Sequence, residues 1–286
     1  MTGHEAGRSA VVAAGAVAGA VAALGLRALR ERPPGGNARW DRTNHAGRTV
    51  TLLEGPAYAV GAASGAALLG AGPGPVLAAS AAAGLGALDD LTGDSTSKGL
   101  KGHLGALARG HVTTGAVKIL GLAVTGLVSA ALIDRQARRD ASAGAPAAAG
   151  APTVVDTLVG GAVVAGSANL LNLLDLRPGR ALKATIGLGV LLSTSRRSGP
   201  AAGAAVGAAA GLLRPDLAGE SMLGDTGANS AGALLGTALV QRTGRRGRWL
   251  ALSVLTALTL ASEKVSFTKV IESTPGLREL DALGRR

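Results

Sequence analysis

Long apolar stretches alternate with short polar segments along the whole chain. The apolar stretches are roughly 15 to 22 residues long, which matches helices that cross the ~30 Å hydrocarbon core of a bilayer. Charged residues are confined mostly to the segments between them. The pattern predicts nine membrane spans, give or take one, at about 9–28, 50–70, 75–90, 112–133, 153–173, 184–195, 200–213, 226–241 and 248–263.

The expected fold class is all-α, a polytopic membrane bundle of about 8–10 short transmembrane helices. The chain contains 45 Gly among its 286 residues, and small residues allow helices to approach closely in lipid. Residues 1–263 are expected to form a transmembrane, catalytic-type domain. Residues 264–286 are expected to form a cytoplasmic amphipathic tail, which lies on the membrane, binds a partner or simply ends in solvent.

Charge gives the predicted orientation. The net charge is +11, and 18 of the 29 Lys and Arg residues fall on the side that holds the linkers 27–48, 89–111, 175–183 and 214–225 and the tail. The positive-inside rule makes that side cytoplasmic. No basic patch is interleaved with aromatic residues, so nucleic-acid binding is not expected. The absence of Cys from the sequence excludes disulfides and thiolate metal sites, so any metal would be hard and bound by oxygen.

The first candidate motif is GALDDLTGDSTSKGLKG, which lies on this predicted cytoplasmic side. Asp89 and Asp90 end an apolar helix, and Lys98 and Lys101 follow. Two adjacent carboxylates at a membrane boundary are costly unless they bind something. Neighbouring helical residues point about 100° apart, so this pair would serve two ligands. The alternative is a plain interfacial helix end, although the helix dipole disfavours carboxylates at a C-terminus.

Two further motifs fall on the same predicted side. In NLLNLLDLRPGR, Asn169, Asn172 and Asp175 share one helix stripe, which indicates a polar partner; hydrogen bonding between helices is the alternative, most of all for Asn169. In MLGDTGANSAGALLG, Asp225 opens a span. Its carboxylate could hold a divalent ion against a phosphate docked on the helix N-terminus, or it could cap the helix in front of a packing face.

Together these segments resemble the polyprenyl-phosphate N-acetylhexosamine-1-phosphate transferases, the superfamily of the phospho-N-acetylmuramoyl-pentapeptide and GlcNAc-1-phosphate transferases. LDDLTGD with the downstream KGLKG looks like the family's Asp-Asp motif and its following Lys. NLLNLLD looks like the Asn-x-x-Asn-x-x-Asp motif, and GDTGAN looks like the Gly-Asp-x-Gly-Ser motif. NARWDRTNHAGRTVTLLEGPAYAVG is similar to the first cytoplasmic loop.

The resemblance implies an enzyme at the cytoplasmic face of the plasma membrane that depends on Mg²⁺ or, in its place, Mn²⁺. It would transfer a sugar-1-phosphate from a UDP-amino sugar to polyprenyl phosphate, release UMP and serve cell-envelope glycan synthesis; a homodimer is compatible with the sequence. Asp89 and Asp90 would be catalytic, and Asp225 and Asp175 would bind the metal. The implied substrate-binding residues are Asn169, Asn172, Asp175, Lys98, Lys101, Arg177, Arg180 and Lys183.

Two departures from the family pattern support an alternative. Asp175 is followed by Leu176 rather than by the family's second Asp-Gly pair, and no His follows His111, whereas the family has a His-rich late loop. The alternative is a catalytically inactive relative that binds the lipid carrier or scaffolds envelope assembly. A solute transporter with an acidic site at the membrane midplane fits less well, because the Asp residues lie at the ends of the spans.

Overall fold

The computed structural model describes residues 3–44, 46–92, 105, 109–110, 113–143 and 151–285. The protein is mostly helical (78%), and the described residues form twelve helices and one antiparallel hairpin. The nine longer helices are α1 (Gly3–Glu31), α3 (Glu54–Leu68), α4 (Pro73–Thr92), α6 (Thr114–Ser142), α7 (Val154–Leu174), α8 (Arg180–Ser193), α9 (Gly199–Leu217), α10 (Gly224–Arg242) and α11 (Arg245–Ser262). The short elements are α2 (Asn37–Trp40), β1 (Asp41–Thr43), β2 (Thr49–Thr51), α12 (Phe267–Ser273) and α13 (Leu277–Ala282).

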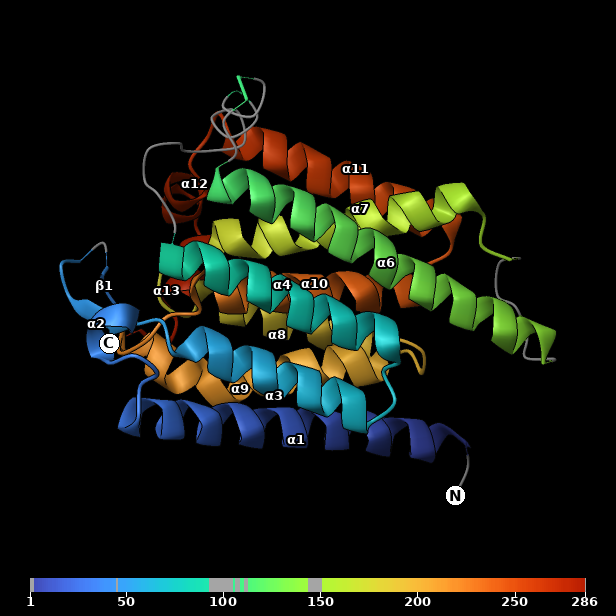
Figure 1. Ribbon diagram of the computed structural model, residues 1–286, viewed down its shortest axis with the longest axis horizontal. Coiled ribbons are helices and arrows are strands. Elements are labelled where there is room, and N and C mark those ends of the chain that lie inside the picture. The colour runs from blue at the N-terminus through green and yellow to red at the C-terminus, as the bar shows by residue number, and fades with distance from the viewer. Residues whose placement is uncertain are drawn as a thin grey trace.

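The longer helices lie side by side and alternate in direction, so the two chain termini lie at opposite ends of the bundle (Figure 1). The helices α4 and α7 end, and α10 begins, at the same end as α2, the hairpin, α12 and α13 (Figure 1). We call this the motif end and the opposite end the far end. The expectation that Asp89, Asp175 and Asp225 share one side is confirmed.

Three helices are long and apolar enough to cross a membrane: Ser9–Glu31, Thr114–Ser142 and Val154–Leu174. A fourth candidate is the pair formed by α11 and α12, which is bent by 94°. The prediction of a helical bundle is confirmed, and within the described part of the chain three to four of the expected spans meet this criterion of length and apolarity. The helices α3 and α8 contain 15 and 14 residues and reach only about 22 and 21 Å at 1.5 Å per residue.

Helix α10 is the central element of the bundle. Nearly every residue from Gly224 to Val240 is buried, and α10 contacts α3, α4, α7, α8 and α9. Its sequence, GDTGANSAGALLGTALVQR, presents small side chains on all faces. Small residues let neighbouring backbones come close, and a helix without a polar face is one that is buried all round. The composition of α10 therefore explains its position.

The same packing joins α1 to α9. A Cβ atom placed on Gly207 would lie 1.9 Å from the carbonyl oxygen of Gly15, and one on Gly211 would lie 2.5 Å from the oxygen of Gly19. Real Cβ atoms do not approach oxygen this closely, so these positions accept only glycine without a shift of one helix. The Gly-rich stretches that the sequence contains are thus contact surfaces between helices.

We expect Gly207→Ala to destabilise the bundle, by roughly 1–3 kcal/mol, because the added methyl group must push α1 away from α9. The matched control is Gly187→Ala in α8, where an added Cβ meets no atom within 4 Å. That change should leave stability unchanged or raise it by up to ~1 kcal/mol through helix propensity. Thermal unfolding of the purified proteins in detergent measures both, and equal midpoints would contradict the packing argument.

Candidate functional site

The last turn of α4 meets the first turn of α10 at the motif end. The carboxylate of Asp90 accepts hydrogen bonds from the backbone N–H groups of Asp225 (3.0 Å) and Thr226 (2.9 Å) and from the Thr226 hydroxyl (2.6 Å). A helix N-terminus leaves such N–H groups without partners and attracts negative charge. Asp90 therefore caps α10 from a neighbouring helix. The N-cap position itself is Leu223, so Asp225 does not cap its own helix.

Asp89, the neighbour of Asp90, belongs to a second group of charges. The ammonium group of Lys118 on α6 lies 2.6 Å from Asp89 Oδ2 and also donates a hydrogen bond to Asp225 Oδ2. Two carboxylates from different helices thus share one cation, and all three side chains are only about one-fifth exposed. Lys118 lies inside the expected span 112–133, and the sequence motifs gave it no role. The sequence feature that could have identified Lys118 is its isolation in an apolar helix, because a charged side chain in a membrane is costly unless it has partners.

Two glycines make this meeting of helices sterically feasible. A Cβ atom on Gly86 would lie 2.2 Å from the carbonyl oxygen of Asp225, so the backbones of α4 and α10 are in direct contact. Gly224 has a φ of +60°, and a Cβ there would lie 3.0 Å from Asp90 Oδ2. A left-handed backbone at such a crowded turn strongly favours glycine. The glycine of the Gly-Asp pair in the third motif is therefore favoured by the geometry of this turn.

Asp175 lies next to the contact between α4 and α10, beside Gly224. It follows the end of α7, is only 8% exposed, and accepts a hydrogen bond from the backbone N–H of Gly224. Its Oδ2 atom has no hydrogen-bond partner. Burial raises the pKa of Asp175 well above its ordinary value, and the nearby Asp216 carboxyl raises it further, while the Gly224 bond lowers it. The third motif residue thus joins the same site.

Two acidic residues that sequence analysis did not select complete the cluster. Glu54 on α3 is 0% exposed and Asp216 on α9 is 2% exposed, and both interact electrostatically with Asp175. Ser221 donates a hydrogen bond to Glu54, and the backbone N–H of Gly179 donates one to Asp216 (2.9 Å). The carboxyl groups of Glu54 and Asp216 also form a hydrogen bond with each other. Clustered buried acids are typical of functional sites, because each acid is costly to bury.

The predicted substrate-binding residues do not all lie in one site. Asn169 donates a hydrogen bond to Thr259 on α11 (3.3 Å), which is the interhelical alternative considered for it. Asn172 is half-buried near the end of α7. Lys98 and Lys101 lie outside the described residues. Only Asp175 of the Asn-x-x-Asn-x-x-Asp motif therefore reaches the carboxylate cluster through a contact that the structure describes.

The three predicted basic residues after α7 contact the C-terminal segment. Arg180 is 5% exposed and binds Asp281 with two hydrogen bonds of 2.8 and 2.9 Å. The ammonium group of Lys183 donates to the backbone oxygens of Leu280 and Asp281, at 3.0 and 2.5 Å. Arg177 lies 3.5 Å from Glu272 on α12. The tail is thus folded back on the motif end, and a simple solvated ending is not what the structure has.

Asp281 is the centre of this attachment. Burial alone would raise the pKa of Asp281, but hydrogen bonds from Arg180 and Arg285 outweigh burial and lower the pKa below its ordinary value. The carboxylate is therefore charged at neutral pH and is neutralised by two guanidinium groups. Arg180 and Lys183 use their donors on the tail, so they would have to exchange partners before they could bind a substrate phosphate.

Within the described residues, no three His, Asp or Glu side chains are arranged so that they could hold a metal ion on their own. Magnesium in phosphoryl-transfer sites usually has one or two protein carboxylates and takes its other ligands from substrate phosphates and water. Asp225 and Asp175, whose carboxyl groups interact electrostatically, would be two such carboxylates. Lys118 would have to leave Asp225 before that carboxylate could bind a cation in full.

The sequence matches no protein-family model, and no curated protein matches it. The resemblance to the polyprenyl-phosphate transferases therefore stays a prediction.

We expect Asp281→Asn to release α12 and α13 from the motif end, because it leaves the Arg180 guanidinium buried without a counter-charge. Breaking one partner of a buried pair costs about 3–5 kcal/mol. Amide hydrogen exchange should become faster across residues 267–282. Glu272→Gln is the matched control, since its pair with Arg177 is exposed and worth about 0–1 kcal/mol. Equal exchange in both variants would mean that Asp281 does not hold the tail.

Proposed function

We propose that this protein is a membrane phosphoglycosyltransferase that moves a sugar-1-phosphate from a UDP-amino sugar to polyprenyl phosphate and releases UMP, in cell-envelope glycan synthesis. One observation carries the proposal. The Asp-Asp, Asn-x-x-Asn-x-x-Asp and Gly-Asp-x-Gly-like motifs are far apart in the sequence, yet Asp89, Asp90, Asp175 and Asp225 meet at one end of the bundle. This is the convergence that the resemblance requires.

In the proposed reaction a phosphate oxygen of the lipid carrier attacks the β-phosphorus of the UDP-sugar. A new P–O bond forms, the bond between the β-phosphorus and the bridging oxygen breaks, and its electron pair leaves with UMP. A phosphate monoester with a second pKa near 6 is largely dianionic at pH 7, so no strong base is needed. Positioning and charge neutralisation dominate phosphoryl transfer. Asp89 and Asp90 would position the attacking phosphate, and Lys118 would neutralise its charge.

Magnesium would supply the neutralisation of the diphosphate. Asp225 would be its principal protein ligand, and Asp175 would offer its unpartnered oxygen. If Asp225 bound the cation, Lys118 would keep only Asp89 as a carboxylate partner and would be available to a substrate phosphate. Lys118 would thus balance the carboxylates before substrate binds and the phosphate charge afterwards.

The full topology belongs to this proposal. All nine longer helices would cross or enter the membrane, with the motif end on the cytoplasmic side of the plasma membrane and the far end outside. The short helices α3 and α8 would face lipid on one side, where Val60 and Leu68 of α3 and Leu188 and Leu191 of α8 are exposed. Residues 264–286 would cover part of the cytoplasmic face.

The proposal predicts that purified protein with Mg²⁺ releases UMP from a UDP-amino sugar only when polyprenyl phosphate is present. Asp225→Asn should lower the rate by roughly 10²-fold or more, because it removes one charge from the site that neutralises the diphosphate. Glu31→Gln, which changes an exposed carboxyl group at the end of α1, should leave the rate unchanged. The proposal fails if UMP release is insensitive to Asp225→Asn or does not require the lipid.

A second prediction tests the geometry rather than the carboxylate. Gly86→Ala should move α4 away from Asp225 and reduce UMP release by about 10²-fold, the usual cost of a displacement near 1 Å. Gly84→Ala on the same helix adds a methyl group where no atom lies within 4 Å, so activity should persist. Comparable activity in the two variants would show that the α4–α10 contact does not set the site.

The alternative function is a catalytically inactive relative that binds the lipid carrier or scaffolds envelope assembly. Two observations favour it: Arg180 and Lys183 are engaged by the tail, and the described acidic groups form no preassembled metal site. This alternative predicts binding of polyprenyl phosphate with no UMP release under any metal. The same assay, with lipid binding measured in parallel, separates the two functions.

A further inference from the structure

A cavity of about 770 Å³ opens at the far end of the bundle. It lies between the start of α4, the second half of α6, the end of α10 and the start of α11, with the connection between α8 and α9 on one side. Its volume falls within the range of sites for small organic ligands. The carboxylate cluster is at the opposite end of the same helices, so this cavity has no part in the proposed transfer reaction.

The lining of this cavity is strongly basic. Among the described lining residues, five are arginines and two, Asp140 and Asp156, are acidic. Asp156 is already neutralised by Arg245, which lies 2.8 Å away. The cavity therefore carries a positive potential that favours an anion. The five arginines are Arg196, Arg197, Arg242, Arg245 and Arg248.

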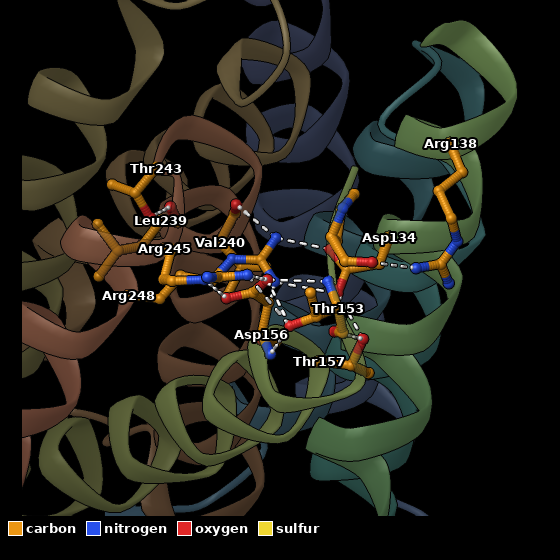
Figure 2. A network of polar contacts seen from close by, with 11 residues as sticks. Asp134, Arg138, Thr153, Asp156, Thr157, Leu239, Val240, Thr243, Arg245 and Arg248 are labelled. Carbon is orange, nitrogen blue, oxygen red and sulfur yellow. Dashed lines mark hydrogen bonds and ion pairs between the residues drawn. The ribbon is translucent and has the colours of Figure 1, made fainter. Parts of the chain in front are cut away.

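Arg248 is fixed in the wall by a buried network (Figure 2). It is only 6% exposed, and its guanidinium group donates two hydrogen bonds to Asp134, at 2.6 and 3.0 Å, and one to the backbone oxygen of Asp156, at 2.9 Å. Asp134 in turn accepts a hydrogen bond from the Thr157 hydroxyl (2.7 Å). The Nε–H group of Arg248 has no partner. This Nε atom has almost no accessible surface, so a ligand in the cavity does not reach it, and the network holds the guanidinium group as part of the wall.

The N-terminus of helix α11 also lines the cavity. Helix α11 begins at Arg245, and its N-cap residue Gly244 provides no side-chain hydrogen bond. The first N–H groups of such a helix attract an anion. Apolar side chains from α4 and α6, including Val76, Leu132 and Ile133, form another part of the wall. A ligand with a negative group and an apolar part would match both kinds of surface.

We propose that this cavity binds a phosphate group, carried by an anionic lipid headgroup or free in solution. Arg196 and Arg242 contribute charge at the rim, and the N-terminus of α11 contributes backbone N–H donors. Arginine is suited to this task because its planar fork of donors matches phosphate oxygens. The proposal concerns the far end alone and does not depend on the function of the motif end.

The test titrates the purified full-length protein in a neutral detergent with three probes: inorganic phosphate, phosphatidylglycerol and phosphatidylcholine of the same chain length. Binding is read from the thermal unfolding midpoint and from native mass spectrometry of bound lipid. We expect saturable binding that weakens roughly fivefold for Arg196→Gln or Arg242→Gln and about 25-fold for the double variant, from about 1 kcal/mol per arginine at a charged lipid surface. Arg248 is left intact, because its loss would disturb the buried network.

Arg135→Gln is the control, because Arg135 is exposed on the same part of α6 but does not line the cavity. It should bind as the wild type does. Binding of phosphatidylglycerol but not of inorganic phosphate would support the lipid source, and binding of inorganic phosphate would support the free ion. Equal affinity for phosphatidylglycerol and phosphatidylcholine without phosphate binding, or an affinity unchanged in the double variant, would overturn the proposal.

Discussion

The contact between the backbones of α4 and α10 is the constraint on which the rest of the structure depends. At Gly86 the backbones of the two helices touch without an intervening side chain. This contact places the carboxylate of Asp90 against the first N–H groups of α10. The same contact brings Asp89 within reach of the Lys118 ammonium that also binds Asp225. The packing of α4 against α10 therefore also brings the charged groups of the site together.

The two ends of the bundle hold different charged sites. Buried carboxyl groups from Glu54, Asp175 and Asp216 gather at the motif end, whereas arginine dominates the described lining of the cavity at the far end. Between the two ends the helices contact one another through glycine and alanine. Charged groups are costly in a membrane interior, so a bundle of small residues can carry them only near its ends or in pairs. The buried pair of Asp134 and Arg248 is one such pair.

Much of the fold could be predicted from the sequence, because apolar length alone locates helices in a membrane protein. The expected span 153–173 corresponds to α7, Val154–Leu174, and the expected span 226–241 corresponds to α10, Gly224–Arg242. Helix α6 continues to Ser142 beyond the expected end at 133, since charged residues after an apolar stretch can remain helical. The acidic motifs could also be recognised in the sequence. The contacts of Lys118 with Asp89 and Asp225, and of Glu54 with Asp175, could not be predicted, because only the tertiary packing brings these residues together.

The attachment of the tail has a consequence for how the molecule is made. Arg180 begins α8, but its counter-ion Asp281 follows 101 positions later, after all nine longer helices. During synthesis the guanidinium group of Arg180 must remain hydrated, or find a temporary partner, until that late segment leaves the ribosome. The contact between the C-terminal segment and the motif end is therefore the last to form. A chain interrupted after α11 would leave the Arg180 guanidinium without its counter-ion Asp281.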